Sequence, residues 1–258
     1  MRAETAAAIR AVSMAIDIAD RRVGADEVSS KGGIDLVTAT DVAGEDIIRK
    51  VLTDSFPDTV VVGEERGGVP EAGKPYWLVD PICGTRPFAS DVPLYCTNIA
   101  LAEDNRVTVA AVALGRCGEI LHAERGKGAW LRKNGTDIPV SPASGSNTLW
   151  VGGRGELVAN ITRAVMLDRR WYVWQFSSSI AYAYLAAGRI AGLIHIAPHL
   201  SSVHTAAGCF IAAEAGARVY DFERNRDWDL DTRSYLLSAT PELHETLLGI
   251  INDCREQR

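Results

Sequence analysis

The spacing of hydrophobic positions predicts where helices and strands alternate along the chain. Near the start, Ile9, Val12, Ile16 and Ala19 recur at helical intervals. They predict an amphipathic helix that ends at about Arg22. Polar residues and glycines follow, and we expect residues 23–41 to form a loop.

Beyond that loop, the pattern predicts a helix and then a long region of strands. The helix is expected over roughly residues 42–53, and it leads into the buried strands TVVVGEE and WLVDPI. The middle of the chain is a meander of short strands, and the last third alternates strands with helices. This order predicts stacked layers in two halves. We expect residues 1–140 to form an N-terminal α+β half with the motifs GEE and DPICGT, and residues 141–258 to form a C-terminal α/β half with the helix HTAAG.

Composition narrows the functional classes. The 258 residues are 47% hydrophobic and 23% charged, with a net charge of −6, which is typical of a globular protein. No basic block is present to bind nucleic acid, and no apolar run is long enough to span a membrane. Charges interrupt the N-terminal apolar residues, so we expect no signal peptide and a cytoplasmic location. The expected partner is a small-molecule substrate.

The five cysteines are odd in number and widely spaced, and no CxxC pair occurs among them. This pattern argues against a disulfide framework and against a structural zinc knuckle. One of them needs a separate explanation. In WLVDPICGTRPF, Cys83 lies between Asp80, at the end of a predicted strand, and a glycine turn. A carboxylate in that position is typical of an active site.

The order of several motifs resembles the inositol monophosphatase family of magnesium-dependent sugar and inositol phosphatases. The motifs are IDLVTATD, VVGEE, WLVDPICGT and HTAAGCFIAAEAGARV, and the likeness runs from about Ile9 to Leu248. The resemblance implies a layered αβαβα sandwich of the inositol monophosphatase and fructose-1,6-bisphosphatase type, assembled as a homodimer. It also implies two or three magnesium ions that polarise a phosphate and activate a water.

The resemblance assigns roles to residues of these motifs. Glu64, Asp80 and the carbonyl of Ile82 match metal ligands, while Asp41 and Thr85 match the pair that orients the water. A second group of residues lies at positions that bind substrate or an anion in the family. Some of them match the family residue and others replace it. This group is Lys31, Gly84, Thr85, Arg86, Phe176 and His195.

Two departures from the family pattern fall on a single metal site. The family motif reads D-P-I-D-G-T, whereas this chain has Cys83 at the second aspartate. The family also has Trp-Asp where this chain has Val203 and His204. A thiol and an imidazole therefore replace two carboxylates that bind the same magnesium, and magnesium disfavours thiolate.

Three interpretations of this replacement stay open. In the first, Cys83 and His204 form a catalytic pair, with Asp80 or Asp41 orienting the imidazole and with a depressed pKa at the thiol. In the second, a metal is retained, either zinc on a Glu64, Asp80, Cys83 and His204 set or magnesium on Glu64 and Asp80 alone. In the third, the chain is a catalytically dead binding protein.

Retention of Asp41, Glu64 and Asp80 counts against the third interpretation. Two carboxylates about 4 Å apart repel by roughly 4 kcal/mol at an effective dielectric constant of 20, which favours a cation among them. The candidates are a metal, an imidazolium at His204, and the side chains of Arg86 and Lys31. Raised pKa values of the carboxyls would also relieve the repulsion. Our first hypothesis is therefore an enzyme of specialised small-molecule metabolism. It would use Cys83 and His204 for metal-independent nucleophilic or acid–base chemistry, such as acyl transfer, hydrolysis or another carbonyl reaction. A magnesium- or zinc-dependent phosphatase is the alternative. His244, in the last helix, is expected on the surface.

Overall fold

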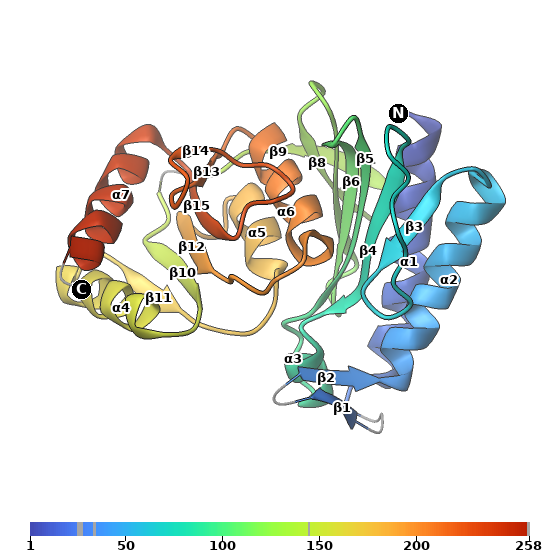
Figure 1. Cartoon of the computed structure of the whole chain (residues 1–258), viewed down its shortest axis with the longest axis horizontal. Coiled ribbons are helices and arrows are strands. Elements are labelled where there is room, and N and C mark those ends of the chain that lie inside the picture. The colour runs from blue at the N-terminus through green and yellow to red at the C-terminus, as the bar shows by residue number, and fades with distance from the viewer. Residues whose placement is uncertain (25–27, 33–34, 144, 257–258) are drawn as a thin grey trace.

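Five layers of helices and sheets make up the molecule (Figure 1). The computed structural model describes residues 1–24, 28–32, 35–143 and 145–256, and the side chains of residues 28, 31, 32, 35 and 36 lie outside the description. The helices are α1 (Ala3–Arg22), α2 (Ala39–Ser55), α3 (Thr85–Ala89), α4 (Glu156–Asp168), α5 (Ile180–Ala186), α6 (Ser202–Glu214) and α7 (Pro241–Glu256). The predicted layered sandwich is confirmed.

Two sheets carry the fold. The seven-stranded sheet has the order β3-β4-β5-β6-β7-β8-β9, and the six-stranded sheet has the order β11-β10-β12-β15-β13-β14. The strands of the first are β3 (Val60–Gly63), β4 (Tyr76–Cys83), β5 (Cys96–Glu103), β6 (Arg106–Leu114), β7 (Glu119–Glu124), β8 (Ala129–Lys133) and β9 (Thr136–Val140). Those of the second are β10 (Thr148–Gly153), β11 (Tyr172–Trp174), β12 (Gly192–Ile196), β13 (Arg218–Asp221), β14 (Arg226–Asp227) and β15 (Ser234–Ser238).

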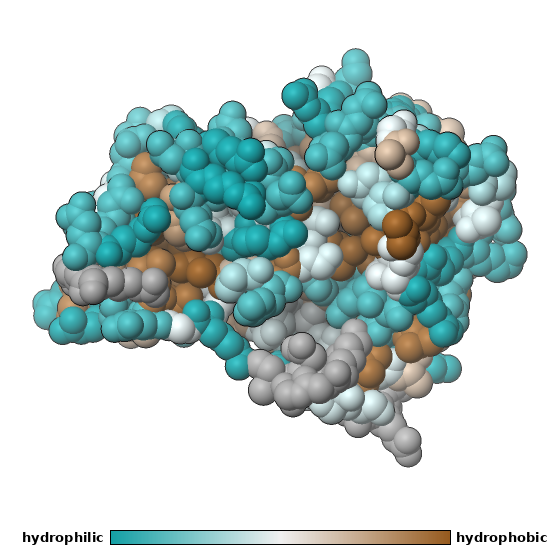
Figure 2. All heavy atoms as spheres, viewed as in Figure 1, coloured by the Kyte–Doolittle hydropathy of each residue, from teal (hydrophilic) through white to brown (hydrophobic). Residues whose placement is uncertain are grey.

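Three hydrophobic cores join the layers. One lies between α1, α2 and the seven-stranded sheet, and a second encloses α5 and α6 between the two sheets. The third packs α4 and α7 on the outer face of the six-stranded sheet. Because both faces of β4 are covered, seven of its eight residues are buried, which explains its nearly continuous apolar sequence. Apolar residues reach the surface in separate patches, one of them near β3 and β4 (Figure 2).

Two sequence expectations are wrong. The predicted loop of residues 23–41 contains a two-stranded hairpin, formed by β1 (Val28–Gly32) and β2 (Asp35–Thr38). His244 is fully buried rather than on the surface, because α7 turns it toward the ring of Tyr220 at 5.2 Å. The extents of α1 and of β4 agree with the prediction to within a residue or two. No helix in the described ranges is long and apolar enough to cross a membrane.

Candidate functional site

The end of β4 brings Asp80 and Cys83 to the same face of the sheet. Residues three apart in a regular strand point to opposite faces. Here the register with β5 shifts between Asp80, which pairs with Asn98, and Cys83, which pairs with Cys96. Pro81 lies inside the irregular stretch and has no N–H to pair, while its carbonyl accepts the Thr97 hydroxyl at 2.8 Å. The irregularity therefore lets both side chains face α5 and α6.

His204 approaches this strand end from the first turn of α6. Its Nδ1 lies 2.8 Å from Oδ2 of Asp80 and 3.7 Å from Oε2 of Glu64. Donor atoms of Asp80, Cys83 and His204 all lie within 4.8 Å of one another. The structure thus brings together the thiol and the imidazole that replace two family carboxylates.

Burial opposes protonation of His204, but the bond to Asp80 and the charge of that carboxylate outweigh this effect. The pKa of the imidazole is raised well above its usual value. An imidazolium therefore lies beside the Asp80 carboxylate. This imidazolium is one of the cations expected among the retained carboxylates.

The prediction that the pKa of the Cys83 thiol is depressed is wrong. The Cys96 thiol beside it, its burial and the charge of Asp80 raise the pKa of Cys83 well above its usual value, and His204 lowers it only in part. The Ser179 amide donates to the Cys83 sulfur at 3.3 Å, and the Ser178 hydroxyl donates to the Cys83 carbonyl at 2.9 Å. Cys83 is thus a protonated thiol held in place by the segment before α5.

Asp41 and Thr85 also lie together, at 3.2 Å between Oδ1 and the hydroxyl, and the hydroxyl reaches the Ile82 carbonyl at 3.3 Å. The other oxygen of Asp41 forms a capping box with Thr38 at the start of α2. Burial raises the pKa of Asp41 to about 6, although the bonds from Thr38 lower it. The negative charges of Glu65 and Glu64 add to the rise. The expected water-orienting pair is therefore assembled, with a carboxyl that holds its proton unusually well.

The turn after Cys83 requires a glycine. Gly84 has φ 107°, and a Cβ there would lie 2.8 Å from the Leu94 carbonyl and 2.9 Å from Ser178. Thr85 then begins α3, which has only five residues and so contributes little macrodipole for the anion that we expected there. Within α3, Arg86 has a buried Nη2 without a partner in the described part of the chain.

The remaining predicted substrate residues fall in two places. Phe176 is partly buried against Trp150, at 5.9 Å between ring centroids. His195 lies on β12, and its Nδ1 is 2.8 Å from the Tyr182 hydroxyl. Lys31 lies in β1, but its side chain is outside the described part.

Sequence reasoning missed several residues that position the site. Asn98, buried on β5, donates to the Ser179 hydroxyl at 2.8 Å and to the His204 carbonyl at 3.2 Å. Glu45, buried on α2, accepts from the amides of Glu65 and Arg66 and so shapes the turn that carries Glu64. A polar residue inside the apolar run CTNIALAE was a usable signal for Asn98, whereas the role of Glu45 depends on how α2 packs.

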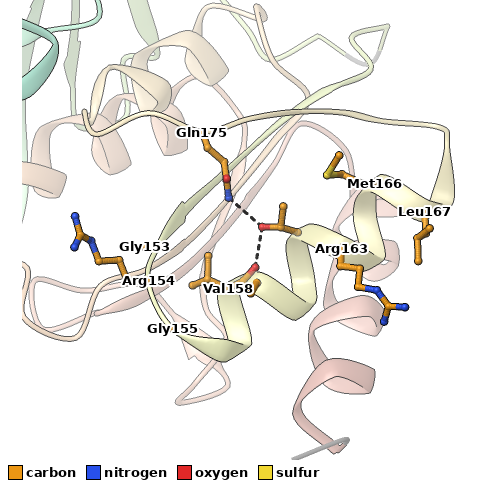
Figure 3. A pocket seen from close by; sticks show the side chains of 10 residues that line it. Gly153, Arg154, Gly155, Val158, Arg163, Met166, Leu167 and Gln175 are labelled. Atoms are coloured by element: carbon orange, nitrogen blue, oxygen red, sulfur yellow. Dashed lines mark hydrogen bonds between the residues drawn. The ribbon is translucent and has the colours of Figure 1, made fainter. Parts of the chain in front are cut away.

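A separate groove lies along α4, with a volume of about 640 Å³. Figure 3 shows Val158, Met166 and Leu167 on its helix side, with Arg154 and Gln175 at its edges. Met166 and Leu167 are more than 60% exposed. The groove holds none of the residues that surround Cys83, so it is distinct from that centre.

Comparisons with known proteins agree on one family. Residues 1–256 match the model of the inositol monophosphatase family. An inositol-1-monophosphatase of Mesorhizobium japonicum is 32% identical over 209 residues, which are 78% of this chain and 77% of that protein. An inositol monophosphatase of Dictyostelium discoideum is 42% identical over 118 residues, 45% of this chain and 43% of that protein. A solved inositol monophosphatase of Thermotoga maritima superposes with a TM-score of 0.85 at 24% identity and covers 96% of both chains.

Proposed function

This chain belongs to the inositol monophosphatase family, and we propose that within it the chain is an enzyme that uses His204 and Cys83 in place of a second metal ion. The observation that carries this proposal is the bond of 2.8 Å between Nδ1 of His204 and Asp80. An imidazole that is oriented by a buried carboxylate is an arrangement suited to proton transfer.

Acid–base chemistry fits the site better than attack by a resting thiolate. Nucleophilic catalysis requires an ionised sulfur, yet the pKa of Cys83 is raised. His204, by contrast, is protonated, and Asp80 stabilises its charge. We propose that a water molecule adds to the carbonyl carbon of an ester while the imidazolium donates a proton to the carbonyl oxygen. The hydroxyl so formed returns this proton to His204 as the carbonyl re-forms, and the proton that the attacking water loses goes to the alcohol that leaves. The Cys83 thiol beside it is the second proton-donating group.

A metal-dependent phosphatase of a sugar or polyol phosphate is the second candidate. Oδ1 of Asp80 is buried without a partner in the described residues, as expected of an oxygen aimed at a cation. Glu64, Asp80 and the Ile82 carbonyl would hold magnesium, which polarises a phosphate and activates water. The paired Asp41 and Thr85 would orient that water. Zinc would instead use Cys83 and His204 together with Asp80.

One pair of assays separates the candidates. Hydrolysis of 4-nitrophenyl acetate is measured in EDTA, and hydrolysis of 4-nitrophenyl phosphate is measured with magnesium or zinc. The proposal expects ester turnover that EDTA leaves unchanged and that His204→Asn lowers on the order of 100-fold. The same assay on Cys83→Ala tests the role of the thiol. Cys117→Ala, at an exposed cysteine, is its matched control.

Phosphate hydrolysis that EDTA abolishes would overturn the proposal in favour of the metal-dependent phosphatase. Inactivity in both assays by a folded protein with a tight partner would instead favour the binding role.

We also propose a cytoplasmic location and a homodimer. The exposed apolar residues of the α4 groove are the surface that we expect a second copy to cover.

A further inference from the structure

Two thiols face each other across the strands that end at the site. Cys83 on β4 and Cys96 on β5 are directly opposite in the antiparallel ladder. Both are free cysteines, and both belong to the core between the two sheets. The Cys96 thiol interacts with the Cys83 side chain, and this interaction is the largest of the effects that raise the pKa of Cys83. The two side chains are therefore neighbours in the reduced protein.

Ser179 holds both sulfurs from the same side. Its amide donates to the Cys83 sulfur at 3.3 Å, and its hydroxyl lies 3.6 Å from the Cys96 sulfur. Asn98 donates to that hydroxyl at 2.8 Å, and its Oδ1 lies 3.5 Å from the Cys96 sulfur. Because one residue contacts both sulfurs, the thiols are kept together at the end of the ladder.

The spacing of opposed strand residues suits a disulfide bond. Residues opposite each other in an antiparallel pair have Cα atoms about 4.5 or 5.5 Å apart, and disulfides span about 4.4–6.8 Å. Their Cβ atoms lie about 4.5–5.5 Å apart, whereas a disulfide needs about 3.8 Å, so the strand ends approach by about 1 Å on closure. The irregular stretch at Pro81, close to Cys83, gives the end of β4 room for this shift.

The open side of this pair is the side of Cys83. Cys83 is 8% exposed and lies beside His204, whose side chain is 18% exposed, whereas Cys96 is fully buried. A molecule the size of hydrogen peroxide that enters the centre therefore meets Cys83 first. Cys96 lies behind it and supplies the second thiol that a sulfenic acid needs to become a disulfide.

We propose that Cys83 and Cys96 are an oxidative modification site, at which a hydroperoxide converts the two thiols into a reversible disulfide. The Cys83 sulfur attacks the terminal oxygen of the hydroperoxide and the O–O bond breaks. Cys83 becomes a sulfenic acid, and its thiol proton goes to the oxygen that leaves as an alcohol or as water. The Cys96 sulfur then attacks the Cys83 sulfur, and the hydroxyl leaves as water with the Cys96 proton. Two electrons pass from the thiols to the hydroperoxide.

Oxidation changes the centre directly. The disulfide removes the Cys83 thiol, which lies beside His204 and which we propose as the second proton-donating group. Because Cys83 is a neutral thiol at rest, oxidation gives up no stabilised thiolate, which favours the disulfide at equilibrium but makes its formation slow. We therefore expect oxidation to switch the ester chemistry off. This consequence rests on the proposed function, whereas the disulfide itself does not.

Mass spectrometry of the wild-type protein tests the disulfide. Trypsin does not cleave before proline, so it leaves the chain intact after Lys74 and Arg86. Cys83 and Cys96 therefore remain in a single peptide, residues 67–106. After treatment with hydrogen peroxide, unfolding in urea and alkylation with iodoacetamide, we expect this peptide to be two hydrogens lighter than its reduced form and to carry no alkyl group. Dithiothreitol before alkylation should return both alkyl groups.

Matched variants separate this pair from the other thiols. Cys209→Ala, at another buried cysteine, should form the disulfide as the wild type does. Cys96→Ser should stop at a sulfenic acid on Cys83, which dimedone traps. A wild-type peptide 67–106 that takes two alkyl groups after peroxide, or oxidation confined to Cys117, would overturn the proposal.

Ester turnover in EDTA is the second readout. We expect it to fall about tenfold as the disulfide forms and to return on reduction, because a proton-donating group is lost and regained. Unchanged turnover in the fully oxidised protein would contradict the switch. Disulfide formation by a protein without ester turnover in either state would sink the proposed function and leave the modification site standing.

Discussion

Nδ1 of His204 lies 2.8 Å from Oδ2 of Asp80, although 124 positions separate the two residues in the sequence. The bond joins the start of α6 to the end of β4. It places a cation against a buried carboxylate at the point where the family resemblance expects a metal ion. If an imidazolium replaces a metal at this position, as we propose, several measurable consequences are expected.

Restoring the family ligands should restore the family chemistry. The double variant Cys83→Asp/His204→Asp recreates an oxygen-only site beside Asp80 and Glu64, which magnesium prefers. We expect it to gain magnesium-dependent hydrolysis of 4-nitrophenyl phosphate at least about tenfold above the wild type, and to lose ester turnover. Each single variant is the control. A double variant that folds, binds magnesium and hydrolyses no phosphate would argue that the rest of the site has also changed.

Asp41 should make the protein less stable as the pH rises. Its carboxyl loses its proton near pH 3.8 when unfolded and near pH 6 when folded, so the unfolded state binds fewer protons between these values. The stabilisation is complete below about pH 4 and is lost by about pH 6. At about 1.4 kcal/mol per pKa unit, the loss in the free energy of unfolding is on the order of 3 kcal/mol.

Urea unfolding of the wild type and of Asp41→Asn across this range measures the effect. Asparagine still accepts from Thr38 but does not titrate, so the variant should lack this part of the pH dependence. Identical pH profiles for the two proteins would contradict the assignment.

Alkylation should show that Cys83 is a thiol at rest. In a Cys117→Ala background, which removes the exposed cysteine, we expect the iodoacetamide rate at Cys83 to keep rising beyond pH 9, the usual thiol pKa. His204→Asn removes a group that favours the thiolate and should slow the reaction further. A rate that reaches its plateau below about pH 8 would return Cys83 to the role of resting nucleophile.

Asn98 should prove essential for the arrangement of the centre. Its amide joins Ser179, which holds Cys83, to the His204 carbonyl. Asn98→Ala leaves these buried groups unsatisfied and should lower the free energy of unfolding by about 1–3 kcal/mol. Thermal unfolding measures the loss. Asn98→Asp, which keeps the shape but donates nothing, is the matched variant and should be no better than alanine.

The layers of the fold could be predicted because they depend on local patterns. Apolar spacing located α1, the buried run WLVDPI located β4, and the motif order supplied the packing of the layers. The hairpin of β1 and β2 escaped prediction because its residues are polar and glycine-rich, without strand alternation. His244 was misplaced because a helix that packs against a sheet buries a wide stripe, and one histidine inside that stripe looks like a surface residue.

The residues that form the site could be predicted from the sequence, but their protonation states could not. The motifs indicated that Asp80, Cys83 and His204 lie together, since each matches a position in the family pattern. The raised pKa of Cys83 depends on Cys96, which reaches it only because of the register between β4 and β5. The Tyr182–His195 bond likewise requires α5 to lie over β12, and no local pattern encodes that contact.

Metal binding tests the central claim most directly. Calorimetric titration of magnesium and zinc into the metal-free wild type, with Cys83→Asp/His204→Asp as the reference, measures whether His204 and Cys83 have replaced an ion. The account predicts that magnesium binds the double variant more tightly than the wild type, and that the wild type has no zinc site that depends on Cys83. Zinc binding at micromolar or lower concentration that is lost in both Cys83→Ala and His204→Ala would contradict it and identify a rebuilt metal centre.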